Sequence, residues 1–495
     1  MTDTMGSFVE HSSLLIDGKL VPAEGGRTFT SLNPATEEPI GESPDASVGD
    51  AERAIEAARR AFDETTWSTD RDFRVHCLRQ FVAALREHLE PLRALTVAEV
   101  GVPVSLTKGP ALEAAIDVLD YYADLAATYE LAHELPPAET RGSMHRRTIE
   151  REAYGVVSAI SAYNYPNQLN LAKLAPALAA GCTVILKGAP DTPLVTQAMA
   201  RLIAEHTDIP PGVVNVISSS EAAVGAVMTT HPGVDMITFT GSTEIGRAIM
   251  AAASPTLKKC FLELGGKSAY LVLDDAILPH AAMFCSYAAG SHAGQGCAIT
   301  TRLVVPRARL DDAANLVAST LQGLTVGDPS DPTMYMGPLI SAKQRDRVQA
   351  HVDRAVADGA TIATGGGRPP ELERGFFFQP TLIVGADENS AIAQDEVFGP
   401  VLVLLPHDGD DDAVRIANNS IFGLSGAVHC SDRERAIRVA RRIRTGTVSI
   451  NGGIYNTPDA PFGGYKQSGF GREMGVAGLE EFLQTKVLAE PAPQA

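Results

Sequence analysis

The fold is indicated most directly by one stretch, MITFTGSTEIG, at residues 236–246. Its β-branched and aromatic run predicts a strand over 236–240, followed by a glycine turn and a helix over 247–253. A strand, a glycine turn and a helix N-terminus together present backbone N–H groups to an anion such as a phosphate. The glycine spacing is GxxxxG, neither GxGxxG nor a P-loop, so a plain strand-to-helix connection is the alternative.

The residues on either side of this stretch extend the same alternation of strands and helices. Short β-branched runs predict strands at 156–161, 183–187, 213–218 and 236–241, with helices over 169–180 and 192–206 between them. Strands that alternate with crossover helices indicate a parallel, doubly wound α/β sheet. Such sheets bind dinucleotides at the carboxyl ends of their strands.

A second alternation, from 268–273 to 446–451, predicts a second α/β domain with Cys297 close to its start. The N-terminal region to about residue 130 is expected to be mainly helical after a short strand and turn at 14–19. Its predicted helices are 47–62, capped by Ser47 and Asp50, then 70–92 and 111–129. Residues 131–152 suggest an extended hairpin, which is either an oligomer contact or a surface excursion.

Size and charge narrow the class of protein. The 495 residues exceed what one hydrophobic core usually supports, so two or more domains are expected. With 45% hydrophobic and 20% charged residues the composition is that of an ordinary globular protein. A net charge of −19 argues against nucleic acid or an anionic membrane as a partner and is otherwise explained by solubility.

The six cysteines are scattered without a CxxC pair or a histidine at ligand spacing. No disulfide framework and no metal site is therefore expected, and a reducing compartment is indicated. The first residues lack a basic segment followed by an apolar run, so no secretion signal is expected, and no apolar stretch approaches the roughly 20 residues that cross a bilayer. The predicted location is cytoplasmic.

Three side chains stand where thioester chemistry would need them. Cys297 follows Gly294 and Gly296, which allow close approach of a substrate, whereas the other cysteines read as buried fillers. Glu263 ends an apolar run, which favours its neutral form and suits a base that takes a proton from water; an edge-strand glutamate is the alternative. Asn164 follows a predicted strand and can donate to an oxyanion, although asparagine before proline is also common in turns.

Lys187 stands at the end of the predicted strand 183–187, beside the expected crevice. A lysine at this place can donate to ribose hydroxyls or to phosphate, and a solvated surface lysine is the alternative reading.

In combination these segments resemble the NAD(P)-dependent aldehyde dehydrogenase superfamily over nearly the whole chain. The resemblance is carried, in order, by six motifs: AYNYP (162–166), FTGSTEIG (239–246), ELGGK (263–267), GQGC (294–297), EVFGP (396–400) and PFGGYK (461–466). It implies a Rossmann-type cofactor domain at 1–130 and 153–264, a catalytic α/β domain at 265–466, and a β oligomerisation arm at 131–152 and 480–495. A homodimer or homotetramer follows from that arm.

The resemblance also implies residue roles. Cys297 would attack the aldehyde, Asn164 and the Cys297 backbone N–H would hold the oxyanion, and Glu263 would activate the water that hydrolyses the thioester after hydride transfer. Lys173 and Glu473 match positions of a proton relay. The residues expected to bind the NAD cofactor are Ile160, Tyr163, Lys187, Gly241, Ser242, Ile245, Leu264, Glu396 and Phe398.

Departures from the family pattern affect cofactor and substrate. Pro190 stands where many NAD-preferring members have a glutamate that binds the ribose 2′-hydroxyl, so NAD is expected with NADP possible, and Asp191 is placed to compensate in part. The tunnel mouth is expected to be medium-polar and to lack an arginine that could clamp a carboxylate, which disfavours an acid semialdehyde. Its expected members are Asn167, Gln168, Leu171, His292, Ala298, Tyr455 and Asn456.

Three other functions compete with this interpretation. A CoA-acylating enzyme would pass the acyl group to a thiol and would not need Glu263. A catalytically silent binding protein would not need Cys297, Asn164 and Glu263 together. A cysteine hydrolase would need a histidine base near the thiol, for which His292 is close in sequence, but it would leave the cofactor segments unexplained.

Overall fold

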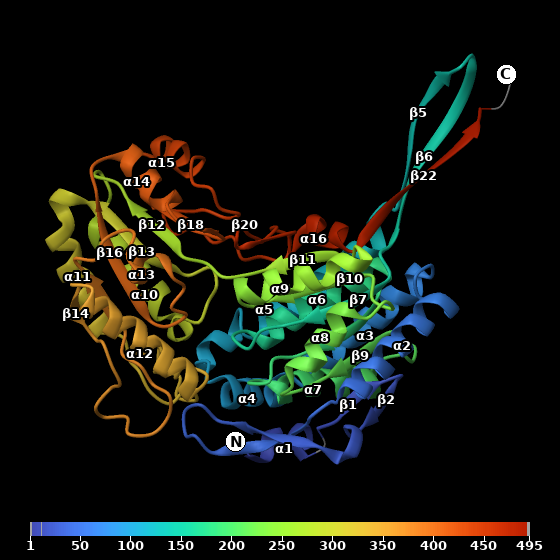
Figure 1. The fold of residues 1–495 in the computed structure, drawn as a ribbon, viewed down its shortest axis with the longest axis horizontal. Coiled ribbons are helices and arrows are strands. Elements are labelled where there is room, and N and C mark those ends of the chain that lie inside the picture. The colour runs from blue at the N-terminus through green and yellow to red at the C-terminus, as the bar shows by residue number, and fades with distance from the viewer. Residues whose placement is uncertain (1, 11, 493–495) are drawn as a thin grey trace.

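The structure is a computed structural model that describes residues 2–10 and 12–492. Residues 1, 11 and 493–495, which belong to the predicted cofactor domain and arm, lie outside the described part. Figure 1 shows two α/β lobes side by side and a slender arm that projects from one of them. No helix within the described ranges is long and apolar enough to cross a bilayer.

The first lobe is built on an eight-stranded sheet in the order β2-β1-β9-β8-β7-β10-β11-β21. Its central strands are parallel, and the pairs β1–β2, β1–β9 and β11–β21 are antiparallel. The strands are β1 (Leu14–Ile16), β2 (Lys19–Val21), β7 (Val156–Ile160), β8 (Thr183–Lys187), β9 (Val214–Ile217), β10 (Met236–Thr240), β11 (Lys259–Glu263) and β21 (Gly469–Phe470). The four strands predicted between 156 and 241 are confirmed.

Helices cover both faces of this sheet, because successive side chains of a strand point to opposite faces. Val157 packs in the core cluster of α3, α5, α6 and α7, whereas its neighbour Val156 packs with α2, α8 and α9. The helices of this lobe are α1 (Thr2–Glu10), α2 (Val48–Glu64), α3 (Arg71–Glu87), α4 (Leu89–Val100), α5 (Glu113–Thr128), α6 (Pro166–Ala180), α7 (Pro193–His206), α8 (Ala222–Thr230) and α9 (Thr243–Ala253). This is the predicted doubly wound architecture.

Three local predictions need correction. The helix expected over 70–92 is two helices that meet at His88, because Pro91 in the first turn of α4 has no N–H to continue α3. The helix after the glycine turn starts at Thr243 rather than 247, with Ser242 as its N-cap. The N-terminal region also contains the hairpin β3 (Thr28–Leu32) and β4 (Pro39–Pro44), which the expectation of mainly helical structure missed.

The second lobe contains a seven-stranded sheet in the order β14-β15-β16-β13-β12-β18-β19, parallel except at β14. Tyr270 faces the layer of α10 and α11, and Leu271 faces α12 to α15. The strands are β12 (Ser268–Val272), β13 (Thr300–Pro306), β14 (Thr361–Thr364), β15 (Thr381–Val384), β16 (Val401–His407), β18 (Gly426–His429) and β19 (Ser449–Ile450). The helices are α10 (Leu278–Gly290), α11 (Leu310–Gln322), α12 (Ala342–Ala357), α13 (Ala391–Gln394), α14 (Asp410–Asn418) and α15 (Arg433–Ala440).

The arm is a three-stranded antiparallel sheet in the order β22-β6-β5. The predicted hairpin consists of β5 (Ala132–Thr140) and β6 (Ser143–Ala153), joined by a turn at Arg141 and Gly142. The C-terminal strand β22 (Leu483–Pro491) pairs with β6 along its whole length. Figure 1 shows this sheet standing away from both lobes. Helix α16 (Gly475–Glu481) precedes β22, and a short pair, β17 (Phe422–Gly423) with β20 (Tyr465–Lys466), lies near the lobe junction.

Candidate active site

The carboxyl ends of four parallel strands in the first lobe meet at one edge of the sheet. Strand pairing places Ile160 beside Lys187 and beside Phe239, and places Thr240 beside Glu263. Segments that are more than 100 residues apart in sequence therefore contribute to one row of strand ends. Ligands of open parallel sheets bind along such an edge.

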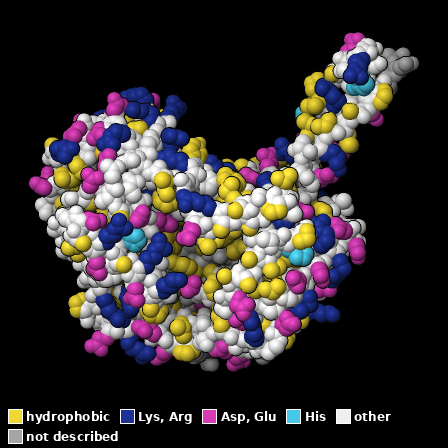
Figure 2. All heavy atoms as spheres, viewed as in Figure 1, with side chains coloured by type: hydrophobic (Ala, Val, Ile, Leu, Met, Phe, Trp, Pro, Cys, Tyr) yellow, Lys and Arg dark blue, Asp and Glu magenta, His cyan; other side chains and the backbone are white. Residues whose placement is uncertain are grey.

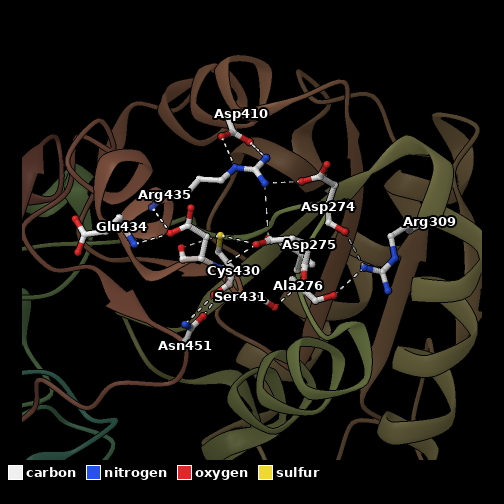
Figure 3. A network of polar contacts seen from close by, with 12 residues as sticks. Asp274, Asp275, Ala276, Arg309, Asp410, Cys430, Ser431, Glu434, Arg435 and Asn451 are labelled. Atoms are coloured by element: carbon white, nitrogen blue, oxygen red, sulfur yellow. Dashed lines mark hydrogen bonds and ion pairs between the residues drawn. The ribbon is translucent and has the colours of Figure 1, made fainter.

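At the corresponding edge of the second sheet, charged side chains pair with one another, as Figure 3 shows. Between the ends of β12 and β18, Arg435 pairs with Asp274 at 2.6 Å and with Asp410 at 2.6 Å. The Asp275 carboxylate accepts a hydrogen bond from the backbone N–H of Asp432 at 2.9 Å. The Asp275 main-chain oxygen accepts one from the Ser431 hydroxyl at 2.7 Å. These charged groups already have partners within their own lobe. The edge of the first sheet is therefore the better candidate for binding a dinucleotide.

Polar groups at the edge of the first sheet have room for further partners. The Lys187 side chain is buried, and its ammonium makes one long hydrogen bond, 3.4 Å, to the Gly188 carbonyl. Burial lowers the pKa of Lys187 to about 8, which the nearby Asp45 carboxylate opposes. The buried Thr240 hydroxyl has no hydrogen-bond partner among the described residues. The surface-lysine alternative for Lys187 is therefore wrong.

The glycine turn after β10 is shaped for close approach. A side chain at Gly241 would collide with the Phe239 ring, since a β-carbon would lie 2.4 Å from it. Ser242 accepts a hydrogen bond from the Ile245 backbone N–H and leaves the first turn of α9 exposed. Ile245 is half exposed beside it, and Leu264 packs under the helix against Gly246. An exposed helix N-terminus in this position suits a phosphate group.

Two further predicted cofactor residues come from the second lobe. The Phe398 ring meets the Tyr163 ring edge-on at 5.9 Å, which joins the EVFGP and AYNYP motifs. The Glu396 carboxylate accepts from the Gly266 backbone N–H at 2.9 Å, and burial raises its pKa. Both lobes therefore contribute to this region, and Figure 2 shows the molecular surface hollowed between them.

The half-buried Cys297 lies directly across from the ELGGK motif. A β-carbon on Gly266 would lie 2.3 Å from the Cys297 main-chain oxygen, so only glycine permits this contact. Burial raises the pKa of the Cys297 thiol well above its usual range, and the negative charges of Glu263, Glu396 and Glu473 add to the effect. Four of the other cysteines are buried as predicted, whereas Cys260 is half-buried.

Asn164 is joined to the cysteine loop by its side chain. Its amide nitrogen donates to the main-chain oxygen of Gln295 at 2.9 Å, and the side chain is 4% exposed. A primary amide has two N–H donors. One of these N–H groups therefore binds the cysteine loop two residues before Cys297.

Glu263 ends β11 with both carboxylate oxygens buried and without a hydrogen-bond partner among the described residues. Burial raises its pKa well above the usual range, Glu473 adds to this, and Lys173 and Arg472 oppose it. The edge-strand alternative is wrong, because β21 pairs with β11 on its outer side. The burial favours the neutral form of this carboxyl group. Once it ionises, its oxygens, which have no other hydrogen-bond partner among the described residues, can take a proton from a water molecule.

Lys173 and Glu473, 300 residues apart in sequence, form a buried ion pair at 3.1 Å. The ammonium also donates to the Thr238 hydroxyl at 3.3 Å. Glu473 is held in place by two backbone hydrogen bonds with Phe462, at 2.7 and 2.8 Å. The pair lies close enough to Glu263 for both charges to act on the pKa of its carboxyl group.

The expected tunnel mouth is only partly present. Leu171 is fully buried in the core of the first lobe, and the Asn167 amide donates to Thr96 and to the Ala111 carbonyl. His292 is also buried, its ring packs edge-on against Tyr165, and burial lowers its pKa to about 4. These three face protein rather than solvent. The remaining four, Gln168, Ala298, Tyr455 and Asn456, are half-buried or exposed.

Sequence reasoning missed two parts of the site. Gln295 was quoted within GQGC without a role, although its side chain makes three hydrogen bonds. The PFGGYK segment, which was quoted as a motif without this role, covers Glu263: a β-carbon on Gly463 would lie 2.9 Å from its carboxylate. For Gln295 the only available signal was a polar residue between two glycines. For the segment that covers Glu263 the only available signal was its closely spaced glycines.

The first sheet has the kind of edge that binds a dinucleotide, and a cysteine, an amide and a buried carboxyl group lie beside it. These features are those of an α/β oxidoreductase that works through a thiol. The sequence profile of the Aldehyde dehydrogenase family matches residues 20–488. The chain belongs to this family. It is an NAD(P)-dependent enzyme that oxidises an aldehyde to a carboxylic acid through a cysteine-bound intermediate.

Individual relatives agree with this assignment. A 3-succinoylsemialdehyde-pyridine dehydrogenase from Pseudomonas sp is 39% identical over 481 residues, covering 97% of this chain and 98% of the relative. The crystal structure of betaine aldehyde dehydrogenase from Staphylococcus aureus in complex with NAD+ has a TM-score of 0.95 at 35% identity, covering 100% and 97%. A mutant of aldehyde dehydrogenase C from Pseudomonas syringae, complexed with NAD+ and octanal, has a TM-score of 0.91 at 38% identity, covering 97% and 96%.

Proposed function

We propose that Cys297 is the nucleophile that attacks the aldehyde carbon and carries the acyl group as a thioester. The oxyanion formed in this step accepts the free N–H of Asn164 and the backbone N–H of Cys297. The raised pKa of the thiol means that its proton must be removed when the substrate binds. What carries this proposal is the contact of the Cys297 loop with both Asn164 and Gly266.

Glu263 is the base for hydrolysis in this proposal. Its unpaired carboxylate oxygens can bind a water molecule, remove its proton and direct the hydroxide to the thioester carbon. The buried Lys173–Glu473 pair would then accept that proton from Glu263 and pass it on. A CoA-acylating enzyme would not need the carboxyl group, so these free oxygens favour hydrolysis.

The strand-end groups of the first lobe fit a nicotinamide dinucleotide. In this proposal Lys187 binds the adenosine ribose, and the turn of Gly241 and Ser242 binds the pyrophosphate. Glu396 of the second lobe binds the second ribose, with Phe398 packing beside it. Ile160, Tyr163, Ile245 and Leu264 would supply apolar contacts around these groups. The bound cofactor supplies the hydride acceptor. The fit rests on the long single hydrogen bond of Lys187, the Thr240 hydroxyl without a partner among the described residues, and the turn in which a β-carbon at Gly241 would meet the Phe239 ring.

The substrate in this proposal is an uncharged aliphatic or aromatic aldehyde, and NAD is the preferred cofactor. The four tunnel residues that reach solvent include no arginine to pair with a carboxylate. The relative from Pseudomonas syringae is described with octanal, which agrees with such a substrate.

The assembly is proposed as a homodimer or homotetramer that uses the arm. Among the residues that the structure describes, the arm strands form a single layer, and Val487 and Leu488 on β22 are about half exposed. We also propose the division into a cofactor domain (1–130 and 153–264), a catalytic domain (265–466) and an arm (131–152 and 480–495). A reducing compartment such as the cytoplasm suits an enzyme with six free cysteines, one of which must remain a thiol.

Substitution of the nucleophile tests this function. A panel of aldehydes is screened with NAD+ and with NADP+, and formation of reduced nicotinamide is followed by absorbance. The Cys297→Ser variant is expected to lose turnover on every aldehyde, while the Cys260→Ser variant, which changes another half-buried cysteine, keeps it. Substantial turnover by the Cys297→Ser variant would reject the nucleophile assignment.

A further inference from the structure

Gln295 is the most extensively bonded side chain of the cysteine loop, two residues before Cys297. It is fully buried, and its amide nitrogen donates to the His292 carbonyl at 3.2 Å and to the Pro338 carbonyl at 3.4 Å. Its amide oxygen accepts from the Ile340 backbone N–H at 3.0 Å. Both donors and an acceptor position are used, so the side chain has one orientation.

The loop that Gln295 anchors is strained. His292, Ala293 and Gly294 lie consecutively in the left-handed region, with φ of 48°, 53° and 72°. Non-glycine residues in this region are strained, and such strain persists only where surrounding contacts impose it. The bonds from Gln295 to the His292 carbonyl and to segment 338–340 are contacts of this kind. They hold the loop in a backbone conformation that it would not adopt unaided.

The main-chain oxygen of Gln295 is the group that receives the Asn164 amide at 2.9 Å. This hydrogen bond and the burial of Asn164 restrict rotation of the amide, and so limit the direction in which its second N–H points. The orientation of the oxyanion donor is thus set by a carbonyl whose own position is set by the Gln295 side chain. A shift of about 1 Å in such a group can reduce a rate by 10²-fold.

We propose that Gln295 is a positioning residue for the oxyanion site: its side chain fixes the cysteine loop, and its main-chain carbonyl orients the Asn164 amide toward the reacting carbonyl oxygen. This inference rests on the proposed function, since it requires Asn164 and Cys297 to act on the substrate. Gln295 itself touches neither substrate nor cofactor in this arrangement.

Two substitutions at one position test it. The Gln295→Met variant keeps the approximate length of the side chain and removes all three hydrogen bonds. It is expected to lower kcat about 10- to 100-fold and to leave the KM for NAD+ unchanged, because the strand ends of the first lobe are untouched. In the Gln295→Glu variant a protonated carboxyl group can still donate to one carbonyl and accept from Ile340, whereas an ionised one faces two carbonyl oxygens.

The Gln295→Glu variant is therefore expected to approach wild-type kcat at the acid end of the pH range and to fall behind progressively as the pH rises. Gln295→Met is expected to be reduced by the same factor at every pH. Gln197→Met is the matched control: this buried glutamine donates to the Ser218 hydroxyl at 2.6 Å in the first lobe, away from the loop. Its kcat should be that of the wild type.

Three results would overturn the inference: wild-type kcat in Gln295→Met, an equal loss of kcat in Gln197→Met, or a ratio of Gln295→Glu to wild-type kcat that does not change with pH. Should Gln295→Met fail to fold, the pH dependence of Gln295→Glu still decides. Failure of the proposed function is distinguishable, because it would appear as turnover by the Cys297→Ser variant whatever the Gln295 variants do.

Discussion

Replacing Glu473 by glutamine removes one charge from the buried ion pair beside Glu263 and leaves the shape of the site almost unchanged. Lys173 and Glu473 are 3.1 Å apart, and their side chains are 0% and 3% exposed. Glutamine can still accept a hydrogen bond from the ammonium, and the bond to the Thr238 hydroxyl remains. The substitution therefore isolates the effect of an uncompensated charge in the core.

The expected magnitude follows from the burial of both partners. Removing one member of a buried pair costs about 3–5 kcal/mol, and the retained hydrogen bond places Glu473→Gln at the lower end, about 3 kcal/mol. Adding Lys173→Met removes the remaining charge, and a well-packed neutral pair is often as stable as the ionic one. The double variant should therefore be more stable than the single variant, which is a non-additive result of the kind expected for neighbours.

The chain contains an intrinsic fluorescent probe for measuring its free energy of unfolding. Trp67 is its one tryptophan, and it is buried in the same core cluster as Phe261, whose ring lies under the Lys173 ammonium at 5.8 Å. Urea unfolding followed by tryptophan fluorescence gives the free energy of unfolding for the wild type and both variants. A single variant as stable as the wild type, or a double variant less stable than the single one, would refute the reasoning.

The same substitution has a consequence for catalysis. The negative charge of Glu473 helps to hold the pKa of Glu263 high, and the positive charge of Lys173 opposes it. With Glu473 neutral, the pKa of Glu263 falls. A base acts when ionised, so the rise of kcat with pH should move to lower pH in Glu473→Gln, provided that hydrolysis limits turnover.

Three further outcomes follow from the site and the arm. Asn164→Ala should lower the rate of the reduced-nicotinamide burst by roughly 10²–10³-fold in stopped-flow absorbance, since one oxyanion donor is lost; a burst of wild-type rate would exclude that role. Because burial lowers the pKa of Lys187 to about 8, its ammonium is present below that pH and lost above it. NAD+ binding measured by calorimetry should weaken as pH rises through 8. Above that pH the Kd of the wild type for NAD+ should approach the Kd of the Lys187→Met variant, which should not change with pH. Deletion of residues 483–492, which contain β22, should reduce the particle mass in analytical ultracentrifugation, and an unchanged mass would exclude the arm from the assembly.

Much of the first lobe was predictable because its signals are local. The strands up to 241 are short β-branched runs, and the capping box of Ser47 and Asp50 marks the start of α2 in the sequence itself. The break at His88 was missed because the apolar periodicity continues across it, although Pro91 was a readable sign. The hairpin β3–β4 is short and mostly polar, which gives little periodicity to detect.

The site was harder to predict than the fold because its contacts join distant segments. Glu263 could be read as a buried carboxyl group from its apolar neighbours, yet its partner in the strand that pairs with β11, Gly469 of β21, lies 206 residues later (469 − 263). Leu171 was misplaced because α6 is buried on almost every side, with Gln168 its one residue that is not buried. The only local signal for Gln295 was its place between two glycines, since its partners at 338–340 come from a separate segment.

The acyl-enzyme intermediate can be detected directly by its mass. The Glu263→Gln variant, mixed with an aldehyde and NAD+ and quenched in acid, should accumulate the thioester because water is no longer activated. Mass spectrometry of peptide 268–302 should then show a gain of the aldehyde mass less one hydride and one proton, located on Cys297 and absent from the buried Cys285 of the same peptide. Reduced nicotinamide formed without this adduct, or an adduct on another residue, would contradict the account.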